Sequence, residues 1–251
     1  MRVTKQIKKE EEMLNLQEAT WTDVQDALKK TDLAIIPIGA VEVYGPHMPQ
    51  GTDGIVAFYF ANKLAKRVNG LLVPLIPVGI SPESLSFPGT LSVQPESLKA
   101  YLRDIAFSLV KHGVKRIVFL TGHRTNFPPM EDLLVELRDK DIKAVAIFTW
   151  QVMYALSSDL AAGEYAQGHA GEFGVSVMLA VREELVNRER FHSNKPKTNL
   201  GSGIPGISIY QRFTDMTDDG IVGNPDLGTK EKGEELLHRG LDQVEKFIKS
   251  W

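Results

Sequence analysis

Two carboxylates and a histidine follow the ends of two predicted strands and make up a candidate metal-ligand set. Glu42 and Asp53 lie in a loop rich in Gly and Pro after the apolar run 33–38, and His123 comes just after the apolar run 116–120. In an open parallel sheet, ligand sites form at the carboxyl ends of the strands. Carboxylate and imidazole ligands suit zinc, manganese or iron, and the chain has no cysteine to supply a thiolate.

Each of these side chains also has an ordinary structural explanation. Asp53 can cap a helix that starts at Gly54, because Asp is a favoured N-cap residue, and for Asp53 alone this is the better explanation. His123 can hydrogen-bond to a loop carbonyl. A third cluster, Gly168-His169-Ala170-Gly171-Glu172, opens a helix, where a carboxylate in the first turn favours the helix dipole. Only their convergence in space would separate these explanations from a metal site.

Four apolar runs predict the strands that position these residues, at 33–38, 71–77, 116–120 and 143–148. Their continuous apolarity is typical of strands buried on both faces of a parallel sheet. Amphipathic stretches between and after them predict helices at 54–68, 94–112, 127–138, 171–186 and 230–250. Alternating strands and helices predict the α/β class, as a three-layer α/β/α fold with a mostly parallel central sheet.

The remaining segments favour one domain over 1–251, with two less regular parts. Residues 1–30 read as a polar lead-in followed by a helix over 14–30. Residues 194–228 form a long loop rich in Gly, Pro, Asn and Asp, and a loop of this length in a compact domain is usually functional or an oligomer contact.

Composition excludes several classes of function. The 29 Lys and Arg against 32 Asp and Glu leave a net charge of −3, which indicates neither a nucleic-acid nor a membrane partner. The first thirteen residues are rich in Lys and Glu and have no apolar core, so they do not resemble a signal peptide. No window approaches the roughly 20 apolar residues that span a bilayer. We therefore expect a cytoplasmic protein.

Four motifs in order identify a family resemblance. They are Glu42-Val-Tyr-Gly-Pro-His47-Met-Pro-Gln-Gly-Thr-Asp53, Gly79-Ile-Ser-Pro-Glu-Ser-Leu-Ser-Phe-Pro-Gly-Thr90, Thr121-Gly-His-Arg-Thr-Asn126 and His169-Ala-Gly-Glu172. The chain resembles the creatininase (creatinine amidohydrolase) family, whose Glu-x-His-Gly-x-His-x-Pro-x-Gly-Thr-Asp loop is matched from Glu42 to Asp53. The likeness extends from about residue 33 into residues 220–225. It implies an α/β/α fold, a homo-oligomer that is often a hexamer, and hydrolysis by a metal-activated water.

The resemblance also implies the metal ligands. In creatininase, two metals are bridged by the position of Asp53, and one of them is also held by the positions of Glu42 and His123. The second metal uses a His and a Glu at the positions of Tyr44 and Thr125, and neither of these is an ordinary ligand. We therefore expect one divalent metal per chain rather than two. Alternatively, His47 or Glu172 completes a second site.

The remaining site residues are candidates for catalysis and substrate binding. His169 is a candidate proton shuttle, because a His near neutral pKa can take a proton from water and return it to the leaving group; a helix-capping imidazole is the alternative. Glu172, about one helical turn further on, would orient His169 or bind metal. Tyr44, Ser81 and Arg124 are candidate contacts to a small-molecule substrate, although a solvated loop Arg is an equally simple explanation for Arg124.

Two departures from the family pattern argue against creatinine itself as substrate. Ser84 replaces the usual His of the second motif, and the residues after Glu172 differ from the usual Glu-Thr-Ser. We expect a metal-dependent hydrolase acting on a small cyclic amide or ketone. One alternative is a carbon-carbon hydrolase that opens the ring of an oxidised inositol such as 3-dehydro-scyllo-inosose, in inositol catabolism. Another is a non-catalytic, oligomeric small-molecule-binding protein that lost the second metal site.

Overall fold

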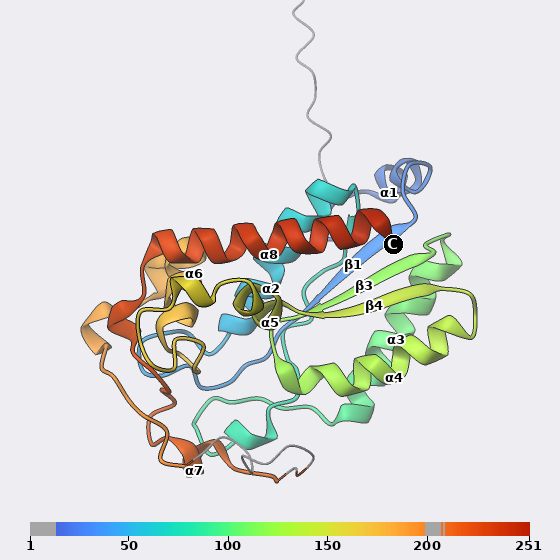
Figure 1. Cartoon of the computed structure of the whole chain (residues 1–251). Helices are drawn as coiled ribbons and strands as arrows, with labels where there is room; N and C mark the ends of the chain where they lie inside the picture. Colours follow the sequence, from blue (N-terminus) through green and yellow to red (C-terminus); the bar gives the residue numbers. More distant parts are fainter. Residues whose placement is uncertain (1–13, 199–206, 208) are drawn as a thin grey trace, which may run out of the picture.

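The computed structural model describes residues 14–198, 207 and 209–251, and a four-stranded parallel sheet lies at its centre (Figure 1). The strands have the order β2-β1-β3-β4 and are β1 (Leu33–Ile38), β2 (Leu71–Leu72), β3 (Arg116–Thr121) and β4 (Lys143–Phe148). The register pairs Ile38 with Thr121 and Thr121 with Phe148. The carboxyl ends of β1, β3 and β4 are therefore level, and the segments that follow them start at one edge of the sheet.

Helices cover both faces of the sheet (Figure 1). The helices are α1 (Trp21–Leu28), α2 (Thr52–Val68), α3 (Pro95–Lys111), α4 (Phe127–Arg138), α5 (Thr149–Ala155), α6 (Glu172–Arg182), α7 (Phe213–Met216) and α8 (Lys230–Ser250). In β1, Leu33 and Ile35 pack in the core shared with α2, α6 and α8, whereas Ala34 and Ile36 pack in the core shared with α3 and α4. The predicted three-layer α/β/α fold with a parallel sheet is confirmed.

Most predicted elements agree with the structure, but two in the first part of the chain are much shorter than predicted. The helix predicted over 14–30 is only Trp21–Leu28, capped by the Thr20 side chain. Before it, Leu14 and Leu16 run beside β2 and exchange backbone hydrogen bonds of 2.9 Å with Leu72. The strand predicted over 71–77 is only Leu71–Leu72, because prolines at 74 and 77 have no N–H to donate to a neighbour.

The last part of the chain differs from the prediction in where α6 ends and in the helical turns within the loop predicted over 194–228. The helix predicted over 171–186 ends at Arg182 and is followed by a 3-10 turn, Glu183–Leu185. Within 194–228, the structure shows α7 and a 3-10 turn, Pro225–Leu227, while residues 199–206 and 208 lie outside the described part, as do residues 1–13 of the lead-in.

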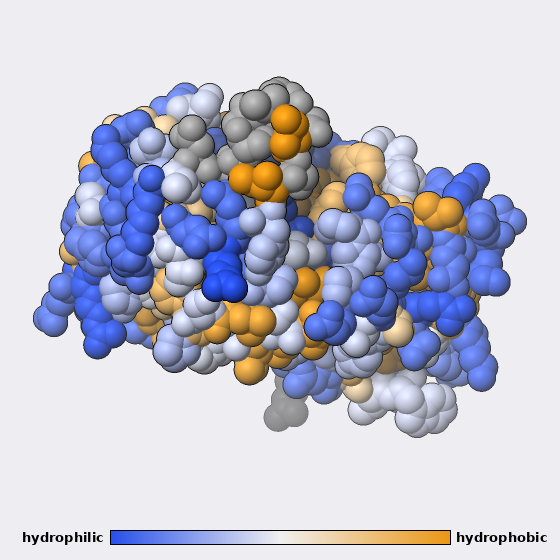
Figure 2. All heavy atoms as spheres, turned by 90° about the horizontal axis from the view of Figure 1, so that it is seen from below, coloured by the Kyte–Doolittle hydropathy of each residue, from blue (hydrophilic) through white to orange (hydrophobic). Residues whose placement is uncertain are grey.

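Exposed apolar residues are found on the loop before α7. Ile207, Ile209 and Tyr210 are 54%, 49% and 69% exposed, so about half or more of each side chain faces solvent. The view from below shows apolar side chains among hydrophilic ones on this side of the molecule (Figure 2). The predicted homo-oligomer stays a prediction.

None of the helices in the described residues combines the length and apolarity needed to cross a membrane.

Candidate metal centre

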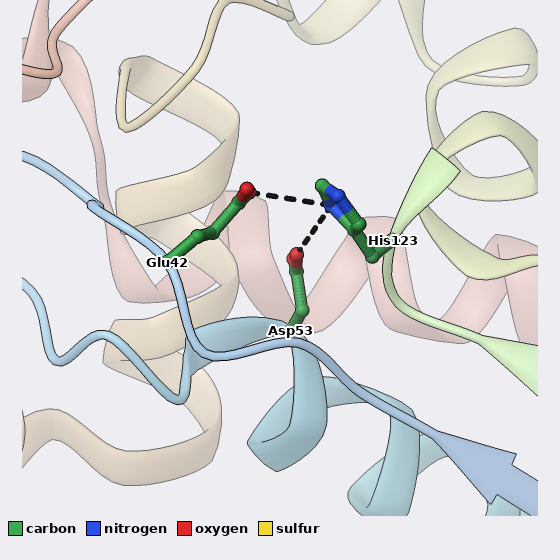
Figure 3. Close-up of side chains that lie close together, drawn as sticks. All are labelled: Glu42, Asp53 and His123. Carbon is green, nitrogen blue, oxygen red and sulfur yellow. Dashed lines mark ion pairs between the residues drawn. The ribbon is translucent and has the colours of Figure 1, made fainter. Parts of the chain in front are cut away.

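Glu42, Asp53 and His123 converge at the carboxyl edge of the sheet (Figure 3). Glu42 lies four residues beyond β1, Asp53 is in the first turn of α2, and His123 comes two residues after β3. One ligand atom from each lies within 4.8 Å of the other two. The three side chains are only 3%, 1% and 8% exposed. The structure thus brings together the three residues that the sequence indicated as metal ligands.

The spacing of these atoms fits a metal ion. His123 Nδ1 lies 3.1 Å from Asp53 Oδ2 and 3.3 Å from Glu42 Oε1. Ligand atoms about 2.1 Å from one ion are separated by about 3.0 Å at octahedral angles and about 3.4 Å at tetrahedral angles. Both separations from His123 Nδ1 fall in this range, and all three ligand atoms lie within 4.8 Å of one another, which is compatible with one shared divalent ion.

Two glycines let the start of α2 approach the strand ends this closely. A Cβ on Gly122, after β3, would lie 2.2 Å from the backbone oxygen of Asp53. A Cβ on Gly39, after β1, would lie 2.4 Å from Gly54 Cα. Both clashes are with backbone, which cannot move aside without displacing α2. These glycines therefore set the depth at which the Asp53 carboxylate enters the site.

The two oxygens of Asp53 have different surroundings. Oδ1 accepts hydrogen bonds of 2.8 Å from the Tyr44 hydroxyl and from Trp150 Nε1. Oδ2 is buried, has no hydrogen-bond donor, and faces His123. The alternative role of Asp53 as a helix cap does not apply, because α2 begins at Thr52 with Gly51 as its N-cap. A buried carboxylate oxygen without a hydrogen bond is costly, and a positive charge beside it, either a protonated His123 or a metal cation, would offset that cost.

Residues of the segment after β2 contact His123 Nε2 and Glu42 Oε2, the atoms that face away from the cluster. Ser81 Oγ lies 3.3 Å from His123 Nε2, and Glu83 Oε1 lies 3.6 Å from the same atom. Ser84 donates a hydrogen bond of 3.3 Å to Glu42 Oε2. A histidine that ligates a metal through one nitrogen is commonly oriented by a partner on the other. Ser81 and Glu83 have that position here.

Burial and charge act against each other at this cluster. Burial alone would lower the pKa of His123, but the Glu42 and Asp53 carboxylates outweigh it and raise that pKa well above its usual value. Burial, and then the charge of Asp53, raises the pKa of Tyr44, which keeps its hydroxyl protonated and donating. A cation bound through His123 Nδ1 would take the place of a proton on that nitrogen.

Asn126 links the exits of the two strands that lead to the candidate ligands with the segment that carries Ser81. Its Nδ2 donates to Gly39 O at 2.9 Å and to Thr121 Oγ1 at 3.1 Å, while its Oδ1 accepts from the Ile80 amide at 2.9 Å. The residue is fully buried. One side chain thus fixes the exits of β1 and β3 and the segment before Ser81 relative to one another.

His169 packs against Tyr44, the residue that donates to Asp53. Its Nε2 is 2.6 Å from Val43 O, and since a carbonyl only accepts, that nitrogen carries a proton. Its ring lies 4.3 Å from the Tyr44 ring and 4.6 Å from that of Phe213, measured between centroids. Nδ1 is then the nitrogen left to accept a proton. The predicted role of His169 as proton shuttle stays a prediction.

Glu172 and His47, the candidates for a second metal site, have other partners. Glu172 is fully buried and accepts hydrogen bonds from two backbone amides and, at 2.6 Å, from Lys232 Nζ. His47 Nε2 lies 3.0 Å from Ala170 O, and burial lowers the pKa of the ring. In the part of the chain that the structure describes, neither groups with Glu42, Asp53 and His123 as a ligand. The geometry gives the second-site hypothesis no support.

Arg124 is the most exposed of the three predicted substrate contacts, Tyr44, Ser81 and Arg124, whose role stays a prediction. It is exposed, next to His123, and forms no ion pair with any described residue. The neighbouring Thr125 hydroxyl donates to Glu83 at 3.0 Å instead of facing the metal ligands.

Sequence reasoning did not assign roles to Trp150 and Glu83. Trp150 comes two residues after β4, as His123 does after β3, so the strand-end rule that selected His123 would also have selected it. Glu83 lies within a motif already singled out, but its contact with His123 joins segments 40 residues apart and has no local signal.

Comparison with known proteins identifies the relatives of this chain. The family model described as Creatininase: Creatinine amidohydrolase matches residues 17–248. The chain belongs to the creatininase family. Members of this family are hydrolases, so the enzyme class predicted from the motifs is supported.

Curated members of the family differ in what their names say they act on. The chain is 27% identical to the creatinine amidohydrolase of Pseudomonas putida, with 88% of this chain and 90% of that protein covered. It is 26% identical to the mycofactocin precursor peptide peptidase of Mycobacterium ulcerans, covering 86% and 84%. It is 24% identical to the 3-dehydro-scyllo-inosose hydrolase of Thermotoga maritima, covering 93% and 82%.

Solved creatininase structures share the fold. A mutant creatininase of Zn-Zn type superposes with a TM-score of 0.82 at 25% identity, with 94% of this chain and 97% of that chain covered. A structure named Creatininase Mn gives a TM-score of 0.81 at 25% identity, covering 94% and 98%. The neighbours thus carry zinc or manganese in their names, which agrees with the ligand types of the Glu42, Asp53 and His123 set.

Proposed function

We propose that this chain is a hydrolase dependent on a divalent metal held by Glu42, Asp53 and His123, and that it acts on a small amide or ketone. The observation that carries the proposal is the convergence of three buried side chains, because ligand atoms of Glu42, Asp53 and His123 all lie within 4.8 Å of one another. Bound there, a divalent ion would acidify a water molecule and polarise the carbonyl group under attack. Zinc, manganese and iron all suit this donor set.

The protein's own residues have separate tasks in this reaction. Ser81 and Glu83 orient the imidazole of His123, and Ser84 holds the outer oxygen of Glu42. His169, with a proton on Nε2 directed at Val43 O, has Nδ1 to receive the water's proton and return it to the leaving group. In amide hydrolysis, the water oxygen bonds to the carbonyl carbon, the C–N bond breaks, and the nitrogen takes that proton.

Substrate contacts come from the polar residues around the ligands. Arg124 has an exposed guanidinium free to hold a carboxylate or hydroxyl of the substrate. Ser84 and Thr125 stand where creatininase has a His and a Glu, and both hydroxyls are already turned to carboxylates of this chain. The substrate is therefore a small molecule other than creatinine.

A carbon-carbon hydrolase is the second candidate. It is favoured by the hydroxyl and carboxylate groups of Ser81, Glu83 and Thr125 near His123, which suit a polyhydroxylated substrate such as an oxidised inositol. A relative named 3-dehydro-scyllo-inosose hydrolase covers 93% of this chain. In that reaction, water adds to a ketone, the adjacent C–C bond breaks, and the released carbon takes a proton.

Metal content tests the common part of both candidates. The full chain, purified without chelator, should carry bound zinc, manganese or iron, and Asp53→Ala should lose it. Asp26→Ala serves as the matched control, because Asp26 is 70% exposed and its ion pair within the described residues is with Lys29, three residues on. A chain without metal after incubation with each ion would contradict both candidates and favour the small-molecule-binding alternative.

A substrate panel separates the two candidates. Cyclic amides, short peptides, creatinine and 3-dehydro-scyllo-inosose are incubated with the metal-loaded chain and with Asp53→Ala. Release of an amine supports amide hydrolysis, and formation of a ring-opened carboxylate from the inosose supports the second candidate. Activity that persists in Asp53→Ala would show that the metal set is not the reacting centre.

A further inference from the structure

Asp53 offers the metal-ligand set only one of its two oxygens. The Tyr44 hydroxyl and Trp150 Nε1 both donate to Oδ1 at 2.8 Å, whereas Oδ2 lies 3.1 Å from His123 Nδ1 and receives no hydrogen bond. The carboxylate is thus divided into an oxygen that faces hydrogen-bond donors and an oxygen that is open to a cation.

This division does not suit a carboxylate that bridges two metals. A bridging carboxylate directs each oxygen at a separate cation. A carboxylate oxygen has about two lone-pair positions, and two donor hydrogens already use both on Oδ1. The hydrogens also carry partial positive charge, which repels an ion approaching Oδ1 from that side.

The two donors are held in place by their surroundings. Tyr44 and Trp150 are only 6% and 4% exposed. The Tyr44 ring lies 4.3 Å from the His169 ring, and the Trp150 ring lies 5.7 Å from the Tyr154 ring, between centroids. Neither donor can swing away from Asp53 without repacking its neighbours.

Ligands for a second ion are also missing near Oδ1. The Thr125 hydroxyl is turned to Glu83 at 3.0 Å, and the Tyr44 hydroxyl is used as a donor to Asp53 Oδ1. Among the described residues, the group of three or more possible ligands contains Glu42, Asp53 and His123 alone. The donor side of Asp53 therefore lacks both room and partners for a cation.

We propose that Tyr44 and Trp150 close the second metal position on Asp53, so that this centre takes one divalent ion where a relative's structure is of Zn-Zn type. The inference rests on the proposed function, because it concerns the same site. Tyr44 and Trp150 are positioning residues: they hold the carboxylate so that Oδ2 faces the ion. Partners of this kind typically change metal affinity by about 10- to 100-fold when removed.

Metal stoichiometry tests this inference without an activity assay. The full chain is stripped with chelator and titrated with Co²⁺, whose visible absorption reports binding, and metal per chain is confirmed by mass spectrometry. Wild type should saturate at about one equivalent. Tyr44→Phe should also take about one, with affinity lower by about 10- to 100-fold. The double variant Tyr44→His, Thr125→Glu removes one donor and adds two ligands, and should take about two.

The outcomes separate this inference from the proposed function. Two equivalents in wild type would overturn the closed second position but leave the hydrolase proposal standing, whereas no uptake would overturn the proposed function itself. A folded double variant that takes one equivalent would show that Tyr44 is not what closes the position. If the double variant does not fold, Tyr44→Phe decides: unchanged Co²⁺ affinity would refute the positioning role.

Discussion

Replacing Lys232 by methionine tests whether Glu172 belongs to the metal centre or to the packing of α8. Lys232 Nζ lies 2.6 Å from Glu172 Oε1 and 3.0 Å from Leu227 O. The Ala162 and Gly163 amides complete the surroundings of the carboxylate. In Lys232→Met, most of the aliphatic stem remains, but Glu172 keeps its charge with only neutral donors around it.

The expected loss of stability follows from the burial of the pair. Removing one partner of a buried ion pair costs about 3–5 kcal/mol, because the other charge stays buried. Glu172 is fully buried, but the Lys232 side chain is 21% exposed, so water replaces part of the lost interaction. We therefore expect the lower end, about 3 kcal/mol. At about 2–4 °C per kcal/mol for a chain of this length, Tm falls by about 6–12 °C.

Thermal unfolding by circular dichroism measures this loss, and metal analysis of the same preparations shows whether the site is affected. Lys232→Met should lower Tm and keep the wild-type metal content. Lys230→Met is the matched control: its ammonium is 3.7 Å from Glu183, both side chains are about half exposed, and Tm should hardly change. A Lys232→Met protein with wild-type Tm and reduced metal would refute the structural role and return Glu172 to the metal centre.

Two further predictions follow from the geometry. Gly122→Ala should lose metal, because its Cβ would lie 2.2 Å from the Asp53 carbonyl; Gly51→Ala, with nothing within 4 Å, is the control, and equal metal content in both variants would contradict the argument. Partial burial would raise the pKa of Asp219, but hydrogen bonds, led by that of His192, lower it from 3.8 to about 2. A depressed pKa contributes stability above pH 3.8 that is lost as pH falls towards about 2, so unfolding followed by fluorescence should show a smaller acid-induced loss in Asp219→Asn, and the same loss in both proteins would show that Asp219 contributes nothing.

Local patterns predicted most of the sheet and its covering helices. The runs at 143–148 and 127–138 have the bounds of β4 and α4, because continuous apolarity and 3.6-residue periodicity are properties of the segment itself. The predictions fail where a distant segment decides the structure. Residues 14–16 were expected to be helical, but pairing with Leu72 makes them extended, and no local signal shows that pairing.

The metal ligands were predictable for a different reason. Glu42, Asp53 and His123 each lie near the end of a strand or the start of a helix, and in a parallel sheet these positions come together at one edge. The motifs that contain these residues also resemble those of one family, which the family model confirms. The hydrogen-bond partners of these ligands could not be predicted, because they come from segments far away in the sequence. The contact between Trp150 and Asp53 joins residues 97 positions apart, and it changes the role of one carboxylate oxygen.

The charges of the centre bear on whether the chain still binds metal. Glu42 and Asp53 are buried, and in the described part of the chain their ion pairs are with His123 alone, so even with His123 protonated the cluster keeps a net negative charge. Buried charge without compensation is costly, and a divalent ion that replaces the proton makes the cluster neutral. A protein that only binds small molecules would carry that cost with no offsetting ion. The replacement of ligands at Tyr44 and Thr125 therefore fits a centre reduced to one metal better than a centre that has lost metal altogether.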